Sequence, residues 1–145
     1  MLFIYYSLSG NGDVVAEAMK EKGYEIRKIE TVKKMPESTF SRIMQGGFKA
    51  SVGYKDKLKD YDKSLDGHDE VVVGAPIWAG KLASPLNTVL RDIDFSGKKL
   101  TFILYAGSGE GPKAERYVKK LYPEAKVIML KEPKVFTSEL EKIVL

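Results

Sequence analysis

Two kinds of hydrophobic spacing alternate along the chain, and each predicts a different kind of element. Largely apolar runs rich in β-branched and aromatic residues are typical of strands that are buried on both faces of a sheet. Such runs lie at residues 2–6, 70–74, 99–105 and 126–130. The run at residues 24–30 is more polar, which predicts a strand at the edge of the same sheet.

Apolar residues recur at helical spacing between these runs, which predicts a helix after nearly every strand. The spacing predicts helices at residues 12–23, 40–48, 82–93 and 112–121 and a short one at 138–145. Pro85 falls in the first turn of its predicted helix, where a missing amide does least harm. Residues 53–67 are rich in Lys and Asp and predict a long surface loop.

The alternation of strands and helices predicts one α/β domain spanning residues 1–145. We expect a doubly wound, five-stranded parallel sheet in the order 2-1-3-4-5, with helices on both faces. Ligands of such sheets bind beyond the carboxyl ends of the strands, where the strand order switches direction. Loops of unusual composition follow the first, third and fourth predicted strands, at residues 7–12, 76–80 and 106–111. These strand ends are neighbours in the predicted order, so the three loops should form one site.

The first of these loops combines two hydroxyls with flexible backbone directly before a helix. Its residues are Ser7, Leu8, Ser9, Gly10, Asn11 and Gly12. Backbone amides at a helix N-terminus, helped by the helix dipole, can hold a phosphate without any cationic side chain. The same residue types also serve as an N-cap and a tight turn. The loop taken alone therefore leaves both interpretations open.

The other two loops favour a flat ligand. The second consists of Pro76, Ile77, Trp78, Ala79 and Gly80, and an exposed indole there would stack on a planar ring. The alternative is that Trp78 folds back over the following helix. The third begins with Ala106, Gly107, Ser108 and Gly109, whose backbone allows close approach unless it is only a turn. A phosphate cradle, an indole and a glycine-rich wall on neighbouring strand ends indicate a pocket for flavin mononucleotide (FMN).

The scarcity of cysteine and histidine limits the metal sites and catalytic groups that the chain can form. The 145 residues include no cysteine and one histidine, which excludes disulfides, thiolate metal sites and cysteine nucleophiles. That histidine, His68, precedes the third strand and so belongs at the opposite end of the sheet from the loops. We therefore expect neither a metal site nor a catalytic side chain. A dinucleotide fingerprint is only partial, because Val15 stands where G-x-G-x-x-G requires its last glycine.

Charge and hydropathy bear on partners and location. The formal charge is +4, but the lysines are dispersed along the chain, which disfavours nucleic-acid binding. No apolar run approaches the roughly 20 residues that span a bilayer, and no signal peptide is evident. We therefore expect a cytoplasmic protein with no membrane contact.

The chain resembles the flavodoxin family over essentially its whole length. Ser7-x-Ser9-Gly10-Asn11 looks like the family's phosphate loop, and GAPIWAGKLASPLNTVL at residues 74–90 looks like its first flavin-ring loop and following helix. The resemblance implies that FMN is held at residues 7–12 and flanked by Trp78 and the 107–109 loop. In two respects the chain departs from the family. Gly12 stands where the family's phosphate loop closes with a threonine, and the chain is basic where electron-carrier flavodoxins are acidic.

The resemblance implies an electron-transfer protein that exchanges electrons with a redox partner protein or a small-molecule acceptor. Two alternatives remain open from the sequence. One is an FMN-dependent NAD(P)H:quinone-type reductase, which would need room for a second planar substrate. The other is an interaction domain that keeps the fold and binds no cofactor.

Overall fold

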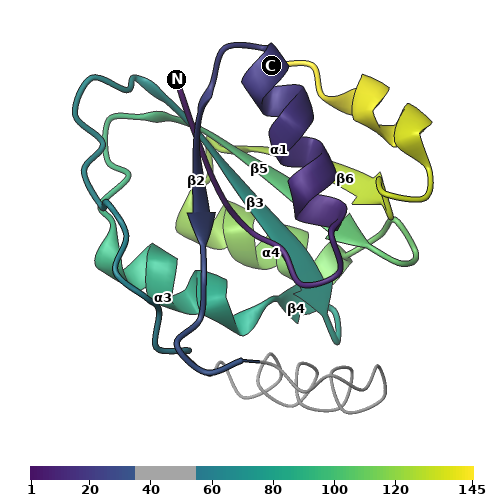
Figure 1. Cartoon of the computed structure of the whole chain (residues 1–145), viewed down its shortest axis with the longest axis horizontal. Helices are drawn as coiled ribbons and strands as arrows, with labels where there is room; N and C mark the ends of the chain where they lie inside the picture. The colour runs from purple at the N-terminus through teal and green to yellow at the C-terminus, as the bar shows by residue number, and fades with distance from the viewer. Residues whose placement is uncertain (35–54) are drawn as a thin grey trace.

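A computed structural model describes residues 1–34 and 55–145 of the chain (Figure 1). Its elements are β1 (Leu2–Tyr6), α1 (Asn11–Glu21), β2 (Glu25–Ile29), β3 (Glu70–Trp78), β4 (Lys81–Leu82), α3 (Ser84–Asp92), β5 (Lys99–Ala106), α4 (Pro112–Leu121), β6 (Lys126–Lys131) and the 3-10 helix η1 (Thr137–Lys142). The helix predicted at residues 40–48 lies outside the described residues.

The long strands form a parallel sheet in the order β2-β1-β3-β5-β6. Since β4 is a two-residue strand outside this path, the order confirms the prediction of five parallel strands arranged 2-1-3-4-5. The polar strand β2 lies at an edge, as its sequence predicted. The sequence did not predict β4, which pairs antiparallel with the end of β3 through Ile77↔Leu82 and Trp78↔Lys81.

Alternate residues of each central strand enter two separate cores, one on each face of the sheet. Helices α3 and α4 cover one face, and α1 and η1 cover the other (Figure 1). Along β1, Ile4 and Tyr6 point to the α3–α4 core, whereas Phe3 and Tyr5 point to the α1–η1 core. This alternation is the side-chain period of two that a strand imposes, and burial on both sides explains why the strand sequences are continuously apolar.

The C-terminal segment differs from its prediction. The helix expected at 138–145 is instead a 3-10 helix over Thr137–Lys142. Leu140 and the residue after η1, Ile143, both pack on the α1–η1 core, and their spacing of three matches one 3-10 turn. No helix in the described part of the chain is long and apolar enough to cross a membrane.

The segment before β3 is irregular, as predicted, but it is not solvated throughout. Asp56 is only 6% exposed and Leu65 only 7%. The Asp56 carboxylate accepts a hydrogen bond from the hydroxyl of Ser84, and its main-chain carbonyl accepts one from Thr88 Oγ1 at 2.6 Å. The prediction of a surface loop was therefore wrong at Asp56, whose buried carboxylate is tolerated because the Ser84 hydroxyl of α3 donates to it.

The contact between β1 and β3 requires a residue without a side chain. Gly74 pairs with Tyr5 across the two strands, next to the stacked rings of Phe3 and Tyr5. A Cβ atom at Gly74 would lie 2.6 Å from Phe3 Cζ and 2.9 Å from Tyr5 Cβ. Both distances are shorter than van der Waals contact, so the aromatic pair and the glycine depend on each other.

We expect Gly74→Ala to lower the free energy of unfolding by about 1–3 kcal/mol, because an overpacked core must shift backbone or rings. Urea denaturation measures this difference. Gly107→Ala is the control, since a Cβ there would meet no atom within 4 Å. An equal loss of stability in both variants would contradict the packing explanation.

Candidate functional site

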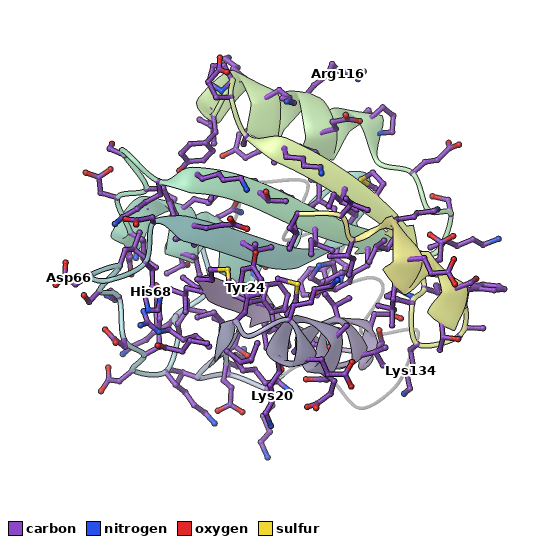
Figure 2. All side chains as sticks on the ribbon, turned by 90° about the horizontal axis from the view of Figure 1, so that it is seen from above. Lys20, Tyr24, Asp66, His68, Arg116 and Lys134 are labelled. Atoms are coloured by element: carbon purple, nitrogen blue, oxygen red, sulfur yellow. The ribbon has the colours of Figure 1, made fainter. Side chains whose placement is uncertain are left out.

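The three loops that the sequence singled out leave neighbouring strands at one edge of the sheet. They follow β1, β3 and β5, which are adjacent in the strand order. His68 lies at the opposite end of the sheet from Lys134, a residue that contacts the first loop (Figure 2). There the His68 ring contacts the amino group of Met1 and the carboxylate of Glu25, each at 3.2 Å. The histidine therefore takes no part in the site.

The first loop leads into α1 through a left-handed residue. Gly10 has φ 96°, a conformation that costs glycine nothing, and no side chain caps the helix. The first backbone hydrogen bond of the turn runs from Val14 N to Gly10 O at 3.2 Å. The amides of Asn11, Gly12 and Asp13 therefore have no acceptor within the helix. Uncapped amides at the positive end of a helix dipole form an anion-binding arrangement.

The two serines of this loop have different surroundings. Ser7 Oγ accepts a hydrogen bond from Gly10 N at 3.2 Å and hydrogen-bonds the Asp13 carboxylate, so it is committed to the shape of the loop. Ser9 Oγ accepts a hydrogen bond from Asn11 Nδ2 at 3.1 Å. A hydroxyl that accepts one bond can still donate its proton, so Ser9 has a donor to offer a ligand. Leu8 packs its side chain against the α3–α4 core and contributes only backbone.

The space beside Gly12 is filled by a tyrosine from another strand. A Cβ atom at Gly12 would overlap the hydroxyl of Tyr105 and lie 2.9 Å from Ser7 Cβ. The Tyr105 hydroxyl donates to the main-chain carbonyl of Tyr6, and burial raises the pKa of Tyr105, so the hydroxyl stays protonated. The tyrosine explains why glycine occupies this position, since the side chain of a threonine would collide with it.

Asp13, the acidic residue in the first turn of α1, is paired with a cation of β2. Asp13 accepts hydrogen bonds from Tyr5 at 2.8 Å and from Lys28 Nζ at 2.6 Å. Burial acts to raise the pKa of Asp13, but the hydrogen bonds from Lys28 and Tyr5 outweigh it and lower that pKa. Burial and the contact with Asp13 raise the pKa of Tyr5, which keeps its hydroxyl a donor. The Asp13 charge is therefore permanent at neutral pH and paired with Lys28.

The second loop is a two-residue hairpin between β3 and β4. Its central residues, Ala79 and Gly80, have φ 49° and 76°. Positive φ at both central positions is the mark of a type I′ turn, whose twist matches that of the paired strands. Glycine adopts this conformation freely, but a left-handed alanine costs roughly 1–2 kcal/mol. The loop therefore stores backbone strain at Ala79, which the sequence did not predict.

Trp78 lies beside the end of β1. Its ring meets the ring of Tyr6 edge to face, with centroids 5.8 Å apart. The indole is partly buried and packs against the α3–α4 core. This position combines the two interpretations left open by the sequence, because one part of the ring contacts the core and the rest stays accessible next to the first loop.

The second and third loops contact each other. A Cβ atom at Gly111 would overlap Ile77 Cδ1, so the start of α4 rests on the second loop. The Pro76 carbonyl accepts a hydrogen bond from Ala83 N at 2.9 Å, which closes the hairpin onto α3. The Ala106 carbonyl accepts hydrogen bonds from Gly109 N and from Glu132 N.

The rest of the third loop is open backbone held by few contacts. Ser108 Oγ exchanges 3.2 Å hydrogen bonds with the main chain of Glu110, and Gly109 has φ 76°. A Cβ atom at Gly107 would meet nothing within 4 Å, so this stretch offers accessible backbone to a flat group.

Lys134, which the sequence analysis did not single out, reaches the first loop from the turn after β6. Its backbone N donates to Asn11 Oδ1 at 3.0 Å, and its Nζ donates to the Ser9 carbonyl at 3.2 Å. Local patterns carry no signal for this contact, because the two partners of the backbone bond are 123 residues apart.

Among residues 1–34 and 55–145, no three His, Asp or Glu side chains are grouped so as to hold a metal ion. Asp62, an aspartate of the loop before β3, forms an ion pair with Arg27, and its Oδ2 lies 3.2 Å from the Arg27 guanidinium.

Comparisons with known proteins agree with this fold. The family model described as flavodoxin matches residues 1–145. No curated protein sequence matches the chain. Among solved structures, a candidate flavoprotein from Bacteroides eggerthii DSM 20697 is 19% identical with a TM-score of 0.73, covering 99% of this chain and 97% of its own.

Two further solved structures contain FMN. A flavoprotein from Lactobacillus acidophilus NCFM in complex with FMN is 16% identical with a TM-score of 0.70, covering 94% of this chain and 95% of its own. An FMN-dependent NADH-azoreductase from Bacillus anthracis is 13% identical with a TM-score of 0.50, covering 97% and 94%. At such low identities the likeness shows a shared fold.

The strain at Ala79 leads to a test. Replacing alanine by glycine normally costs about 0.4–1 kcal/mol, because the unfolded chain gains freedom. We expect Ala79→Gly to be neutral or to raise the free energy of unfolding by up to about 1 kcal/mol, since relief of the left-handed strain offsets that cost. Ala18→Gly inside α1 should instead lose about 1 kcal/mol. Urea denaturation of both variants gives the comparison, and equal losses would show that Ala79 is unstrained.

Proposed function

We propose that this chain, which belongs to the flavodoxin family, binds one FMN across the three loops at the carboxyl edge of its sheet and transfers electrons through it. The observation that carries the proposal is the uncapped N-terminus of α1. Three of its amides lack helical acceptors, and Ser9 offers a further donor beside them. A phosphate monoester is the group that such a donor set fits.

The remaining loops fit the flat part of the same ligand. Trp78 and the Ala79–Gly80 turn would lie on one side of the flavin ring, and the backbone of residues 106–109 on the other. Gly10 and Gly12 would bring main-chain amides to the phosphate, with Ser7 and Asn11 fixing the loop. The bound flavin would supply the redox chemistry, and the protein its position and surrounding charge.

An electron carrier is the role that needs the fewest groups, because no side chain of the site has to act as an acid or base. The electrons would pass to a redox partner protein or a small-molecule acceptor in the cytoplasm. The fold shared with an FMN-dependent NADH-azoreductase supports a second candidate, a reductase that oxidises a nicotinamide cofactor. Steady-state oxidation of NADH or NADPH by the FMN-loaded protein, with a quinone or azo dye as acceptor, separates the two. Turnover supports the reductase, and its absence supports the carrier.

FMN binding itself can be followed through Trp78, the single tryptophan of the chain. We expect titration of the purified protein with FMN to quench the tryptophan emission, because the accessible part of the indole would face the flavin. Trp78→Ala should weaken FMN binding by about 1–3 kcal/mol, as loss of an aromatic partner typically does.

Riboflavin is the matched ligand for this titration, since it lacks only the phosphate. It should bind more weakly than FMN because it leaves the α1 amides without their anion. A protein that binds neither flavin would be a cofactor-free interaction domain. Binding with unquenched emission would place the ring away from Trp78.

A charge placed at Ser9 tests the phosphate position. Ser9→Asp should weaken FMN binding at least tenfold, because a carboxylate would face the phosphate across a few ångströms. Ser9→Ala removes the donor without adding charge and should cost much less. Isothermal titration calorimetry with FMN measures both variants. Unchanged FMN affinity in Ser9→Asp would mean that the phosphate lies elsewhere.

A further inference from the structure

The turn after β6 joins the third loop to the first. Glu132 N donates to the Ala106 carbonyl at 3.2 Å, and the Glu132 carbonyl accepts hydrogen bonds from Val135 N at 2.7 Å and Phe136 N at 2.9 Å. Two residues beyond Glu132, the backbone of Lys134 bonds to Asn11. The turn is therefore held at both ends, and it carries Lys134 to the N-terminus of α1.

Asn11 acts as the clamp between this turn and the first loop. Its carboxamide oxygen accepts the bond from Lys134 N at 3.0 Å, and its carboxamide nitrogen donates to Ser9 Oγ at 3.1 Å. Both ends of the carboxamide are thus occupied, and reversing the group would place its NH2 against Lys134 N and break that bond. Asn11 therefore fixes the position of Lys134 relative to Ser9.

The side chain of Lys134 lies over the residue that begins α1. Its Nζ donates to the Ser9 carbonyl at 3.2 Å, and a Cβ atom at Gly10 would lie 3.1 Å from Lys134 Cδ and 3.2 Å from its Nζ. Within residues 1–34 and 55–145, no carboxylate forms an ion pair with this ammonium. Because an ammonium has three protons and one is used on Ser9, two remain for a ligand.

We propose that Lys134 is the cation that pairs with the FMN phosphate and that Asn11 is the residue that positions it. The proposal rests on the proposed function, since it concerns the same site. The first loop contains no cationic side chain of its own, and its amides and hydroxyl carry only partial charges. A phosphate dianion forms shorter and stronger hydrogen bonds with an ammonium than with neutral donors. Lys134 would therefore give the site its preference for phosphorylated over unphosphorylated flavin.

The test compares FMN with riboflavin in variants of the full-length protein. We expect Lys134→Met to weaken FMN binding about tenfold or more and to leave riboflavin binding within about twofold. Lys134→Arg keeps the charge and should retain most of the preference for FMN. Lys120→Met is the matched control, because it removes the same charge from the exposed surface of α4. Thermal unfolding of each variant without flavin verifies that the fold is intact.

Two further measurements distinguish a direct role of Lys134 and Asn11 in FMN binding from a purely structural one: the dependence of FMN affinity on salt, and a double-mutant cycle. Raising the salt concentration should weaken FMN binding to the unmodified protein and affect Lys134→Met less, because salt screens the ammonium–phosphate attraction. Asn11→Ala should weaken FMN binding in the unmodified protein and have little further effect in Lys134→Met, since the two residues act as a unit. Equal effects of Asn11→Ala in both backgrounds would overturn its positioning role.

The outcomes separate this proposal from the function on which it rests. If the unmodified protein binds FMN but Lys134→Met keeps the same FMN-to-riboflavin affinity ratio, Lys134 is no phosphate ligand and the proposed function stands. If the unmodified protein binds no flavin, the proposed function itself fails. A tenfold loss confined to FMN, absent in Lys120→Met and restored in Lys134→Arg, supports the assignment.

Discussion

The site depends on one hydrogen bond inside the protein, from the hydroxyl of Tyr105 on β5 to the main-chain carbonyl of Tyr6 at the end of β1. A buried hydroxyl and a buried carbonyl must both be satisfied, and here each satisfies the other. The bond ties the end of β1 to β5 although β3 runs between them in the sheet. It also brings the tyrosine ring so close to α1 that only glycine fits at position 12.

Two lysines from distant segments place their charges beside the first loop. The carboxylate of Asp13 lies in the first turn of α1, and Lys28 pairs with it from β2. The ammonium of Lys134 instead donates to the main-chain carbonyl of Ser9, and no carboxylate among residues 1–34 and 55–145 pairs with it. One cation thus pairs with a carboxylate, and the other is the one that we propose pairs with a phosphate. The chain's formal charge of +4 is less informative than these two placements.

The second and third loops show how a rigid scaffold supports exposed backbone. The Ala79–Gly80 turn is held by the short strand pair β3–β4, which allows the left-handed conformation of Ala79 to persist. Gly111 packs against the side chain of Ile77, so the glycine-rich third loop is in contact with the strand that carries this turn. The accessible backbone at Gly107 and the indole of Trp78 are thereby fixed relative to each other without a side-chain bond between them.

The sequence by itself determined the long strands, the helices between them and the order of the strands in the sheet. Strands buried on both faces and helices with one apolar stripe leave different hydrophobic periods, and these periods are local properties that can be read directly. The strand order expected for such an alternation placed the three unusual loops on neighbouring strand ends. The composition of the first loop was compatible both with an anion site and with a simple capped turn, and it did not choose between them.

Only the tertiary structure decided the contacts between distant segments. The approach of Lys134 to Ser9, the hydroxyl of Tyr105 beside Gly12 and the burial of Asp56 against α3 each join residues far apart in the chain. Two short elements could not be predicted from the sequence. Strand β4 has only two residues, too few to show a hydrophobic period. The apolar spacing of η1 fits a 3-10 helix as well as the α-helix that was expected. Hydrophobic periodicity reports which face of an element is buried, whereas the identity of the partner on that face depends on how the whole chain packs.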